Sequence, residues 1–338
     1  MNNVHEIPPP AVTVVIPVYN LEEYIDACLD SVEAQTFPDF EAIVVNDGST
    51  DGSEEKLLSH ARRDPRIEVV TVSNRGVSLA REAGIARARG RYICFLDGDD
   101  RWMPDMLSRM VEAISENGGY DIVCCNHKRI CATYESPVRE RRTEDMQGLD
   151  FLEATLCHAI SVTVWGKLYR RELFAQGLHY YPLHLGEDSL LNIEIGCRMP
   201  RVRFLDYVGY GYVQRAGSSN HRNFDIAYCR LFCEAVEREL NRHGRVLGGR
   251  TEFYALLNKL RWYQVYIRKC SSRWAGGSEF AVHVYALADR YRSELRARYS
   301  RWSLLLLDMY RFHWLKPAVA MASTVMRWNT SLQRRLAR

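Results

Sequence analysis

The stretch YICFLDGDDRW, Tyr92–Trp102, joins an apolar run directly to three carboxylates. Its first half, Tyr92–Leu96, has the short, apolar and aromatic composition of a buried β-strand. Asp97, Asp99 and Asp100 follow at once, in a tight turn that a glycine permits. A buried strand that ends in polar residues is typical of the ligand-binding edge of a parallel sheet. This stretch therefore predicts both a fold class and the position of a site.

The same alternation of strand and helix extends over the first 126 residues. Short apolar runs predict strands at Val12–Pro17, Glu41–Asn46, Ile67–Val72, Tyr92–Leu96 and Asp121–Asn126. The segments between them predict helices at Glu22–Ala34, Ser53–Arg62, Val77–Ala88 and Pro104–Glu116. We expect an α/β, Rossmann-like fold with a mostly parallel sheet flanked by helices. The polar ends of the first, second and fourth strands, PVYN, NDGSTDGS and DGDD, are expected to meet in one cleft.

The rest of the chain has a less regular pattern. Residues 128–148 are charged and predict an irregular surface segment, whereas Gly186–Arg198 predicts a helix packed on the sheet. Val202–Tyr207 and Val208–Gln214 predict a pair of strands, and long helical stretches follow beyond Gly217. We therefore expect a ligand-binding α/β domain over residues 1–216 and a helical, basic C-terminal region over residues 217–338.

Charge divides the chain in a similar way. Residues 216–338 contain 22 Lys and Arg against 9 Asp and Glu, whereas residues 1–215 carry a balance of −10 within a whole-chain charge of +3. The basic part suits an anionic surface, either nucleic acid or phospholipid. Arg301–Leu315 and Lys316–Trp328 predict helices lying in a membrane interface, since neither reaches the ~20 apolar residues of a membrane span. The alternative is a helical subdomain or dimer contact with a basic outer face.

The expected compartment follows from the cysteines and the N-terminus. Ten cysteines without paired spacing predict reduced, mostly buried thiols. The first residues lack the basic and apolar pattern of a secretory signal. We expect a cytoplasmic protein, peripheral on the inner face of the cytoplasmic membrane if its basic part binds phospholipid.

Two acidic strand ends are candidate ligand sites. Asp97 and Asp99 form a D-x-D pair whose oxygens could hold a hard divalent cation together with substrate phosphates, and an ordinary acidic turn is the alternative. Asp47, at the tip of the second strand, could accept a ring N–H from uracil, thymine or guanine. The alternative for Asp47 and its neighbours is a turn and helix cap.

Four other residues are candidates for contact with a nucleotide base or phosphate, or for accepting a proton. Arg75 and Arg81 could meet a nucleotide base or a phosphate, unless they are solvated surface arginines. Asp188 is our candidate general base, with Glu187 as the second choice. The alternative is that these carboxylates cap the helix that begins there.

Acceptor contacts are expected from the segment that follows residue 160 and from later loops. Trp165 and Lys167 could line an acceptor pocket, with core packing of the indole and a solvated amine as the alternatives. His184, Arg215 and His221 lie in predicted loops and could close over a diphosphate, although an unremarkable surface role is the commoner reading of such residues.

Six segments, in this order, closely resemble the family-2 glycosyltransferases, which have the GT-A fold. They are VTVVIPVYN, EAIVVNDGSTDGS, NRGVSLAREAG, GRYICFLDGDDRWMPDML, VWGKLYRRELF and GEDSLLN, and they span residues 12–198. The resemblance implies a nucleotide-sugar donor, usually a UDP-sugar, a divalent metal, Mg²⁺ or Mn²⁺, and inversion at the anomeric carbon. It fades in the last third of the chain.

The resemblance also implies a role for individual residues. Asp47 would bind the base, Arg81 would approach the base or diphosphate, and Asp188 would be the catalytic base. The residues that would flank the nucleotide are Pro17, Tyr19 and Asn20, and those of the metal and ribose site are Asp97 and Asp99. Two positions depart from the family pattern, since Gly98 replaces a commoner serine or alanine and Glu82 a commoner asparagine.

We therefore expect an inverting glycosyltransferase, of hexosyl or N-acetylhexosaminyl type, in bacterial cell-surface polysaccharide assembly. Its expected partners are a nucleotide-sugar donor, a glycan or lipid-linked glycan acceptor, and an anionic membrane surface or a second copy of the chain, but not nucleic acid. One rival is a nucleotidyltransferase that makes a sugar-nucleotide, which would need a Gly-rich phosphate loop that the sequence lacks after the first strand. The other rival is a catalytically inactive assembly scaffold, against which Asp47, Asp97, Asp99 and Asp188 argue.

Overall fold

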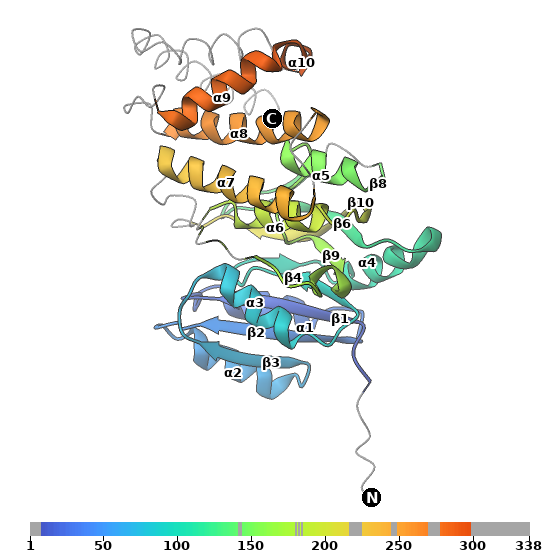
Figure 1. Cartoon of the computed structure of the whole chain (residues 1–338). Helices are drawn as coiled ribbons and strands as arrows, with labels where there is room; N and C mark the ends of the chain where they lie inside the picture. The colour runs from blue at the N-terminus through green and yellow to red at the C-terminus, as the bar shows by residue number, and fades with distance from the viewer. Residues whose placement is uncertain are drawn as a thin grey trace, which may run out of the picture. The chain divides into compact units, whose positions relative to one another are not determined.

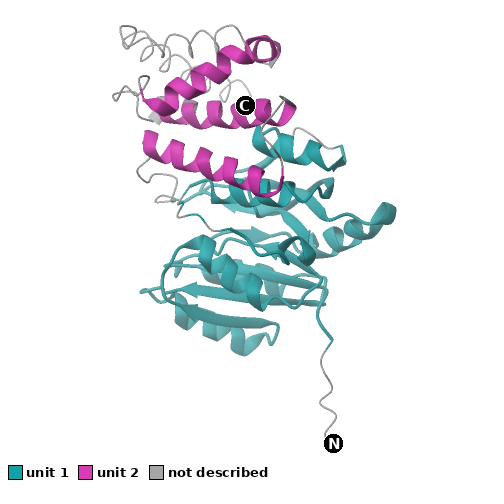
Figure 2. Ribbon diagram, in the orientation of Figure 1, with its two compact units in different colours: residues 1–221 teal, residues 222–338 magenta. Residues whose placement is uncertain are grey.

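The computed structural model describes residues 8–140, 144–179, 181, 183, 185–215, 225–244, 249–269 and 278–298. The chain divides into two compact units, Met1–His221 and Arg222–Arg338 (Figure 2). The boundary that we predicted after residue 216 falls within the stretch 216–224, which is outside the described residues. The roles assigned to the two parts remain predictions.

The first unit contains a ten-stranded sheet built from the described residues (Figure 1). Its strands are β1 Val12–Val18, β2 Phe40–Asp47, β3 Ile67–Val72, β4 Tyr92–Phe95, β5 Arg101–Trp102, β6 Ile122–Ile130, β7 Glu135–Val138, β8 Met146–Gln147, β9 Lys167–Arg170 and β10 Arg201–Val213. Its α-helices are α1 Ile25–Glu33, α2 Ser53–Arg63, α3 Val77–Arg87, α4 Met106–Ser115, α5 Leu149–Leu156 and α6 Glu187–Gly196, with short 3₁₀ helices at Glu116–Gly118 and Arg171–Phe174. The strands and helices predicted for the first 126 residues are all confirmed.

The second unit is helical over its described residues. Its helices are α7 Ile226–Arg242, α8 Gly249–Lys269, α9 Glu279–Arg290 and α10 Arg292–Arg298. No helix in the described part of the chain is long and apolar enough to cross a membrane. The two predicted interface helices, residues 301–315 and 316–328, lie outside the described residues.

The sheet has the strand order β3-β2-β1-β4-β9-β6-β10-β5, with β7 paired to β6 and β8 to β10. The block β3-β2-β1-β4 is parallel, as expected for strands connected by α-helices. β9 then pairs antiparallel with both β4 and β6, and β10 runs parallel to β6. The sheet is therefore mixed, and the ends of β1, β2 and β4 lie next to one another.

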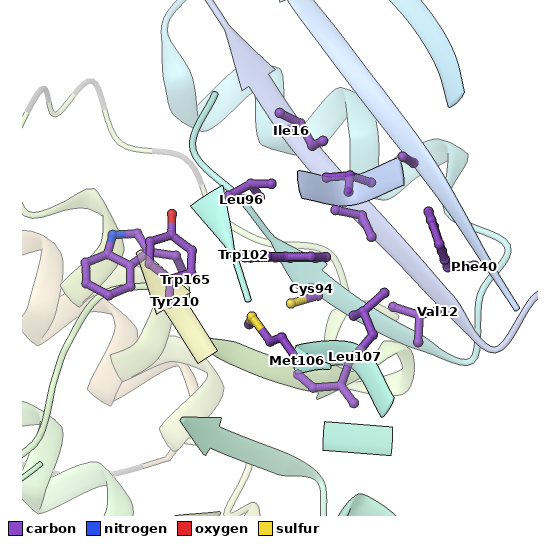
Figure 3. Close-up of a cluster of buried hydrophobic side chains, with 14 of the residues drawn as sticks. Val12, Ile16, Phe40, Cys94, Leu96, Trp102, Met106, Leu107, Trp165 and Tyr210 are labelled. Atoms are coloured by element: carbon purple, nitrogen blue, oxygen red, sulfur yellow. The ribbon is translucent and has the colours of Figure 1, made fainter. Parts of the chain in front are cut away.

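Apolar side chains are buried on both faces of the sheet, which explains why the strands read as continuous apolar runs. Successive residues point to opposite faces, so Val14 and Ile16 join the cluster beneath α1 and α4, while Val15 joins the cluster beneath α5 and α6. Figure 3 shows the first cluster, where Trp102 and Met106 pack among strand residues. Two packed faces hold the strand ends rigidly in place.

Two predictions about the later sequence are wrong. Residues 128–148 are not irregular throughout, because β6 continues to Ile130 and β7 and β8 add short strands at the sheet margins. The two strands predicted over residues 202–214 are instead one strand, β10, which spans Arg201–Val213. Register shifts between Phe204 and Val208 and between Val208 and Tyr210 absorb the polar interruption that suggested a turn.

Candidate active site

Three strand ends meet at one edge of the sheet. The ends of β1 and β2 are joined by Asn20, whose N–H donates to Ser49 Oγ at 3.1 Å and whose side-chain oxygen accepts the Thr50 N–H at 2.8 Å. At the end of β4, a Cβ on Gly98 would lie only 3.1 Å from the Pro17 carbonyl oxygen. The ends of β1 and β4 therefore approach closely at Gly98, and a side chain there would require small shifts of its neighbours.

The residues predicted to flank a nucleotide lie around this edge. Pro17 is buried within β1, and Tyr19 just beyond it is 45% exposed. Asn20 has a φ of 51°, a conformation that asparagine adopts more readily than most residues. An exposed ring beside a buried strand end is suited to stacking on a planar ligand.

Asp47 is buried at the end of β2 and holds the start of α3. Its Oδ1 accepts the Arg75 N–H and its Oδ2 accepts the Gly76 N–H, both at 2.9 Å. Gly76 has a φ of 92°, which favours glycine at this helix cap. Arg75 itself is exposed. Asp47 therefore has a structural role, and any contact with a base must use the remaining lone pairs of its oxygens.

Arg81 joins two of the predicted site carboxylates. Its side chain, only 4% exposed, extends from α3, donates from Nη1 to Asp188 Oδ1 at 2.7 Å and donates from Nη2 to Asp97 Oδ1 at 2.9 Å. Burial opposes the charge on Arg81, but Asp188 and Asp97 outweigh that cost and raise its pKa. Burial also raises the pKa of Asp97 to about 6, against the influence of Arg81. The predicted metal and base residues thus belong to one ionic network.

Asp188 and Glu187 begin α6 and differ in their partners. Asp188 Oδ2 accepts the Val164 N–H at 3.2 Å, so both of its oxygens are engaged once Arg81 is counted. Glu187 forms no hydrogen bond or ion pair with another described residue, and it lines a small hollow of about 30 Å³ together with Arg81. Burial, followed by the charge of Asp188, raises the pKa of Glu187 to about 7. Among the described residues, the pair therefore offers one carboxylate with both oxygens engaged, Asp188, and one that no other side chain or backbone group bonds, Glu187.

Asp99 and Asp100 both connect the DGDD turn to the end of β10. Asp99 Oδ2 accepts from Arg215 Nε at 2.6 Å. Asp100 is fully buried, and it accepts from Tyr210 Oη at 2.6 Å and from the Val213 N–H at 2.7 Å. Burial and the charges of its two aspartate neighbours raise the pKa of Asp100 to about 9. Asp100 is a structural carboxylate, whereas Asp99 remains partly accessible.

Trp165 and Lys167, the predicted acceptor contacts, lie in the interior. The Trp165 ring stacks on Tyr210 with centroids 4.4 Å apart, and Figure 3 shows the two rings side by side. Lys167 is 3% exposed, and its amine donates to the carbonyl oxygens of Ser161 and Thr163. Both residues are packed in the interior of the first unit. A contact of either residue with an acceptor stays a prediction. His184 and His221 lie outside the described residues.

Sequence reasoning missed Tyr210. Its hydroxyl accepts the Asp97 N–H at 3.3 Å and donates to Asp100, so it joins the two ends of the DGDD turn from a strand more than 100 positions away. The residues next to Tyr210 in the sequence, Gly209 and Gly211, give no indication of this role, because the contact joins residues that are far apart in the chain.

Asp97 and Asp99 fit a hard divalent cation. Each uses one carboxylate oxygen for an arginine, and the other oxygen, Asp97 Oδ2 or Asp99 Oδ1, has no hydrogen bond to a described residue. Oxygen ligands of this kind suit Mg²⁺ or Mn²⁺, which also accept water and phosphate oxygens. Within the described residues, no third His, Cys, Asp or Glu ligand atom groups with these two. A cation here would therefore depend on a phosphate-bearing ligand for much of its coordination.

The fold is that of the GT-A class of glycosyltransferases. TarS 1–349 from S. aureus, solved in complex with UDP-GlcNAc, shares it with a TM-score of 0.68 and 19% identity, over 94% of this chain and 92% of that chain. Residues 13–178 match the model of glycosyl transferase family 2.

Relatives in sequence agree with the family model. The chain is 38% identical to the uncharacterized glycosyltransferase EpsJ of Bacillus subtilis over 62% of each chain, so it spans less than two thirds of that protein. It is 31% identical to the uncharacterized glycosyltransferase YibD of Escherichia coli, over 68% of this chain and 71% of that protein. The chain belongs to glycosyl transferase family 2.

Proposed function

We propose that the protein is an inverting glycosyltransferase that moves a hexosyl or N-acetylhexosaminyl group from a UDP-sugar to a hydroxyl of a glycan or lipid-linked glycan. The observation that carries this proposal is the bridge from Asp97 through Arg81 to Asp188. It connects a carboxylate suited to the diphosphate side of a donor with one suited to deprotonating an acceptor. The UDP-GlcNAc bound to TarS supports a UDP-sugar as the donor.

The donor would lie along the edge formed by β1, β2 and β4. Tyr19 offers an exposed ring for the base, and Asp47 offers its remaining lone pairs to a ring N–H. Asp97 and Asp99 would hold Mg²⁺ or Mn²⁺, and such an ion neutralises charge on a departing diphosphate. Arg75, exposed at the start of α3, is available to a phosphate or base.

The proposed reaction is a single displacement. The acceptor oxygen forms a bond to the anomeric carbon while the bond from that carbon to the diphosphate oxygen breaks. The acceptor proton passes to Asp188, and the nucleoside diphosphate leaves with the bonding electron pair. Arg81 fixes the orientation of Asp188, and one displacement inverts the anomeric configuration.

The acceptor class is inferred from the basic C-terminal part of the chain. Residues 216–338 carry a balance of +13, which suits the phosphate of a lipid-linked glycan at the inner leaflet. We propose a role in bacterial cell-surface polysaccharide assembly on this ground and on the family membership.

Metal-dependent donor hydrolysis tests the proposal. UDP-, GDP- and dTDP-sugars would be incubated with Mn²⁺, and release of the nucleoside diphosphate measured for wild type, Asp99→Asn and the exposed control Asp30→Asn. We expect UDP-sugar turnover, unchanged in the control and reduced about 100-fold or more in Asp99→Asn. Equal turnover by wild type and Asp99→Asn would contradict the metal assignment. Pyrophosphate release from a sugar 1-phosphate and a nucleoside triphosphate would instead identify a nucleotidyltransferase.

A further inference from the structure

The Asp99–Arg215 ion pair occupies the carboxylate that the proposed metal needs. Arg215 Nε lies 2.6 Å from Asp99 Oδ2, and the guanidinium carbon lies 5.2 Å from the centre of the Tyr24 ring. The side chain of Arg215 is 26% exposed and that of Asp99 is 22% exposed, so water can reach the ion pair. The contact can therefore open without unfolding its surroundings.

The fold places Arg215 at Asp99. The Val213 N–H donates to Asp100 at 2.7 Å, and Tyr210 joins the same carboxylate and the Asp97 backbone. These contacts fasten the end of β10 to the DGDD turn two residues before Arg215. The buried contacts of Tyr210 and Val213 thus place Arg215 next to Asp99, which distinguishes this ion pair from a contact between two unanchored surface side chains.

We propose that Arg215 is an internal counter-ion of Asp99 that exchanges Asp99 for the donor diphosphate, so that metal and nucleotide bind cooperatively. This inference depends on the proposed function. Arg215 uses Asp99 Oδ2, and a divalent cation on Oδ1 of the same carboxylate would lie close enough to the guanidinium to be repelled by it, since both are positive. Without nucleotide, metal binding therefore weakens the Asp99–Arg215 pair and releases Arg215 toward water.

With nucleotide present, the displaced arginine gains a new partner. A diphosphate presents several anionic oxygens, to which a guanidinium can bond in a bidentate manner. The metal and the diphosphate therefore each improve the binding of the other, and Arg215 supplies part of the coupling. By linkage, the factor by which UDP tightens Mn²⁺ equals the factor by which Mn²⁺ tightens UDP.

The test measures Mn²⁺ binding to the full chain by electron paramagnetic resonance of free Mn²⁺, without UDP and with saturating UDP, corrected for Mn²⁺ bound to free UDP. The variants are Arg215→Gln, Arg215→Lys and the exposed control Arg87→Gln, whose guanidinium lies beside Glu68. We expect Arg215→Gln to bind Mn²⁺ alone about 5–10-fold more tightly than wild type and to show an enhancement by UDP that is smaller by a similar factor but not abolished. Arg215→Lys, which keeps the charge, should bind Mn²⁺ alone close to wild type but show a smaller enhancement by UDP, because an ammonium cannot bond to the diphosphate in a bidentate manner. The control should match wild type in both measurements.

Two other results would contradict the counter-ion role of Arg215, and the behaviour of Asp99→Asn distinguishes between them. If Mn²⁺ affinity without UDP is the same in Arg215→Gln and wild type, while Asp99→Asn abolishes Mn²⁺ binding, the metal site stands and the counter-ion role is overturned. If Asp99→Asn leaves Mn²⁺ binding unchanged, or wild type binds no Mn²⁺ with or without UDP, the metal assignment and this inference both fall. Thermal unfolding followed by circular dichroism shows whether each variant is folded, and a tighter Mn²⁺ complex cannot arise from misfolding.

Discussion

Arg81 separates two carboxylates that would otherwise repel one another, Asp97 and Asp188. A buried guanidinium is costly by itself, and its two partners offset that cost through charge and geometry. The planar guanidinium group of Arg81 can bridge the two carboxylates because a different nitrogen donates to each of them. Removing this side chain leaves both carboxylates without their counter-ion.

We expect Arg81→Met to lower the free energy of unfolding by about 3 kcal/mol, because it leaves partly buried charges unpaired. Arg81→Lys should lose less stability, but its single ammonium cannot span both acids, so turnover should still fall at least tenfold. Urea denaturation and donor turnover measure the two effects. The matched control is Arg87→Met on the same helix, where the side chain is exposed and stability should stay within about 0.5 kcal/mol. An Arg81→Met protein as stable as this control would refute the bridge.

Glu187 gives the reaction an expected pH dependence. Its pKa, raised to about 7, means that the side chain is protonated below that pH and ionised above it. Ionisation places a second negative charge beside Asp188, which favours transfer of a proton to that carboxylate. We therefore expect kcat/KM of wild type to rise as pH increases through about 7.

The variants separate the two acids. Glu187→Gln should flatten the rise near neutral pH while keeping measurable turnover, and Asp188→Asn should lose activity by about 100-fold or more at every pH. Glu172→Gln, an exposed carboxylate in the same unit, serves as the control. If Glu187→Gln is inactive at every pH and Asp188→Asn keeps the wild-type profile, Glu187 is the proton acceptor and our assignment is reversed.

The DGDD turn and β10 act as one structural element, held together by Asp100. Two donors from one strand reach one buried carboxylate, so the turn that carries Asp97 and Asp99 cannot move independently of β10. The folded-state pKa of Asp100, about 9, lies above the ordinary unfolded value of about 3.9. Its protonation therefore stabilises the fold fully at low pH, and this contribution is lost as pH rises toward 9.

We expect Asp100→Asn to change stability by about 1 kcal/mol or less at neutral pH, because the amide can accept the Val213 N–H and donate to Tyr210. Asp100→Ala should cost about 2–3 kcal/mol, since it leaves these buried donors without a partner. Urea unfolding of wild type and Asp100→Asn between pH 5 and 9 provides the second measurement. Wild type should lose stability relative to Asp100→Asn as pH rises, and a gap that stays constant would show that Asp100 is ionised throughout.

The elements nearest the site were predictable because their signals are local. β1, β2 and β4 are apolar runs that lead into polar residues, so their positions, their directions and the ligand edge follow together. β10 was not predictable as one strand, because the polar Asp206 and glycines interrupt it and its register shifts against β6. The aspartates of the site could be named in advance, but not that Arg81 and Arg215 would pair with them, since those contacts depend on the tertiary fold.

At the scale of the whole molecule, charge and function are unevenly distributed. The candidate site belongs to the unit formed by Met1–His221, and the excess of basic residues belongs to the chain beyond it. The net negative charge of the first 215 residues is repelled from an anionic membrane, so the proposed membrane-linked acceptor would require attraction from the other part of the chain. The basic C-terminal sequence is the part that can supply it.

We expect the full chain to float with liposomes that contain phosphatidylglycerol but not with phosphatidylcholine alone, and salt should weaken this binding. Each basic residue near such a surface contributes about 1 kcal/mol, so the double reversal Arg334→Glu and Arg335→Glu should reduce binding at least tenfold. The matched control reverses two exposed arginines of the first unit, Arg62 and Arg171, and should retain binding. Because both variants have the same net charge, a general charge effect would weaken them equally. That outcome, or flotation independent of lipid charge, would exclude the C-terminal sequence as the membrane contact.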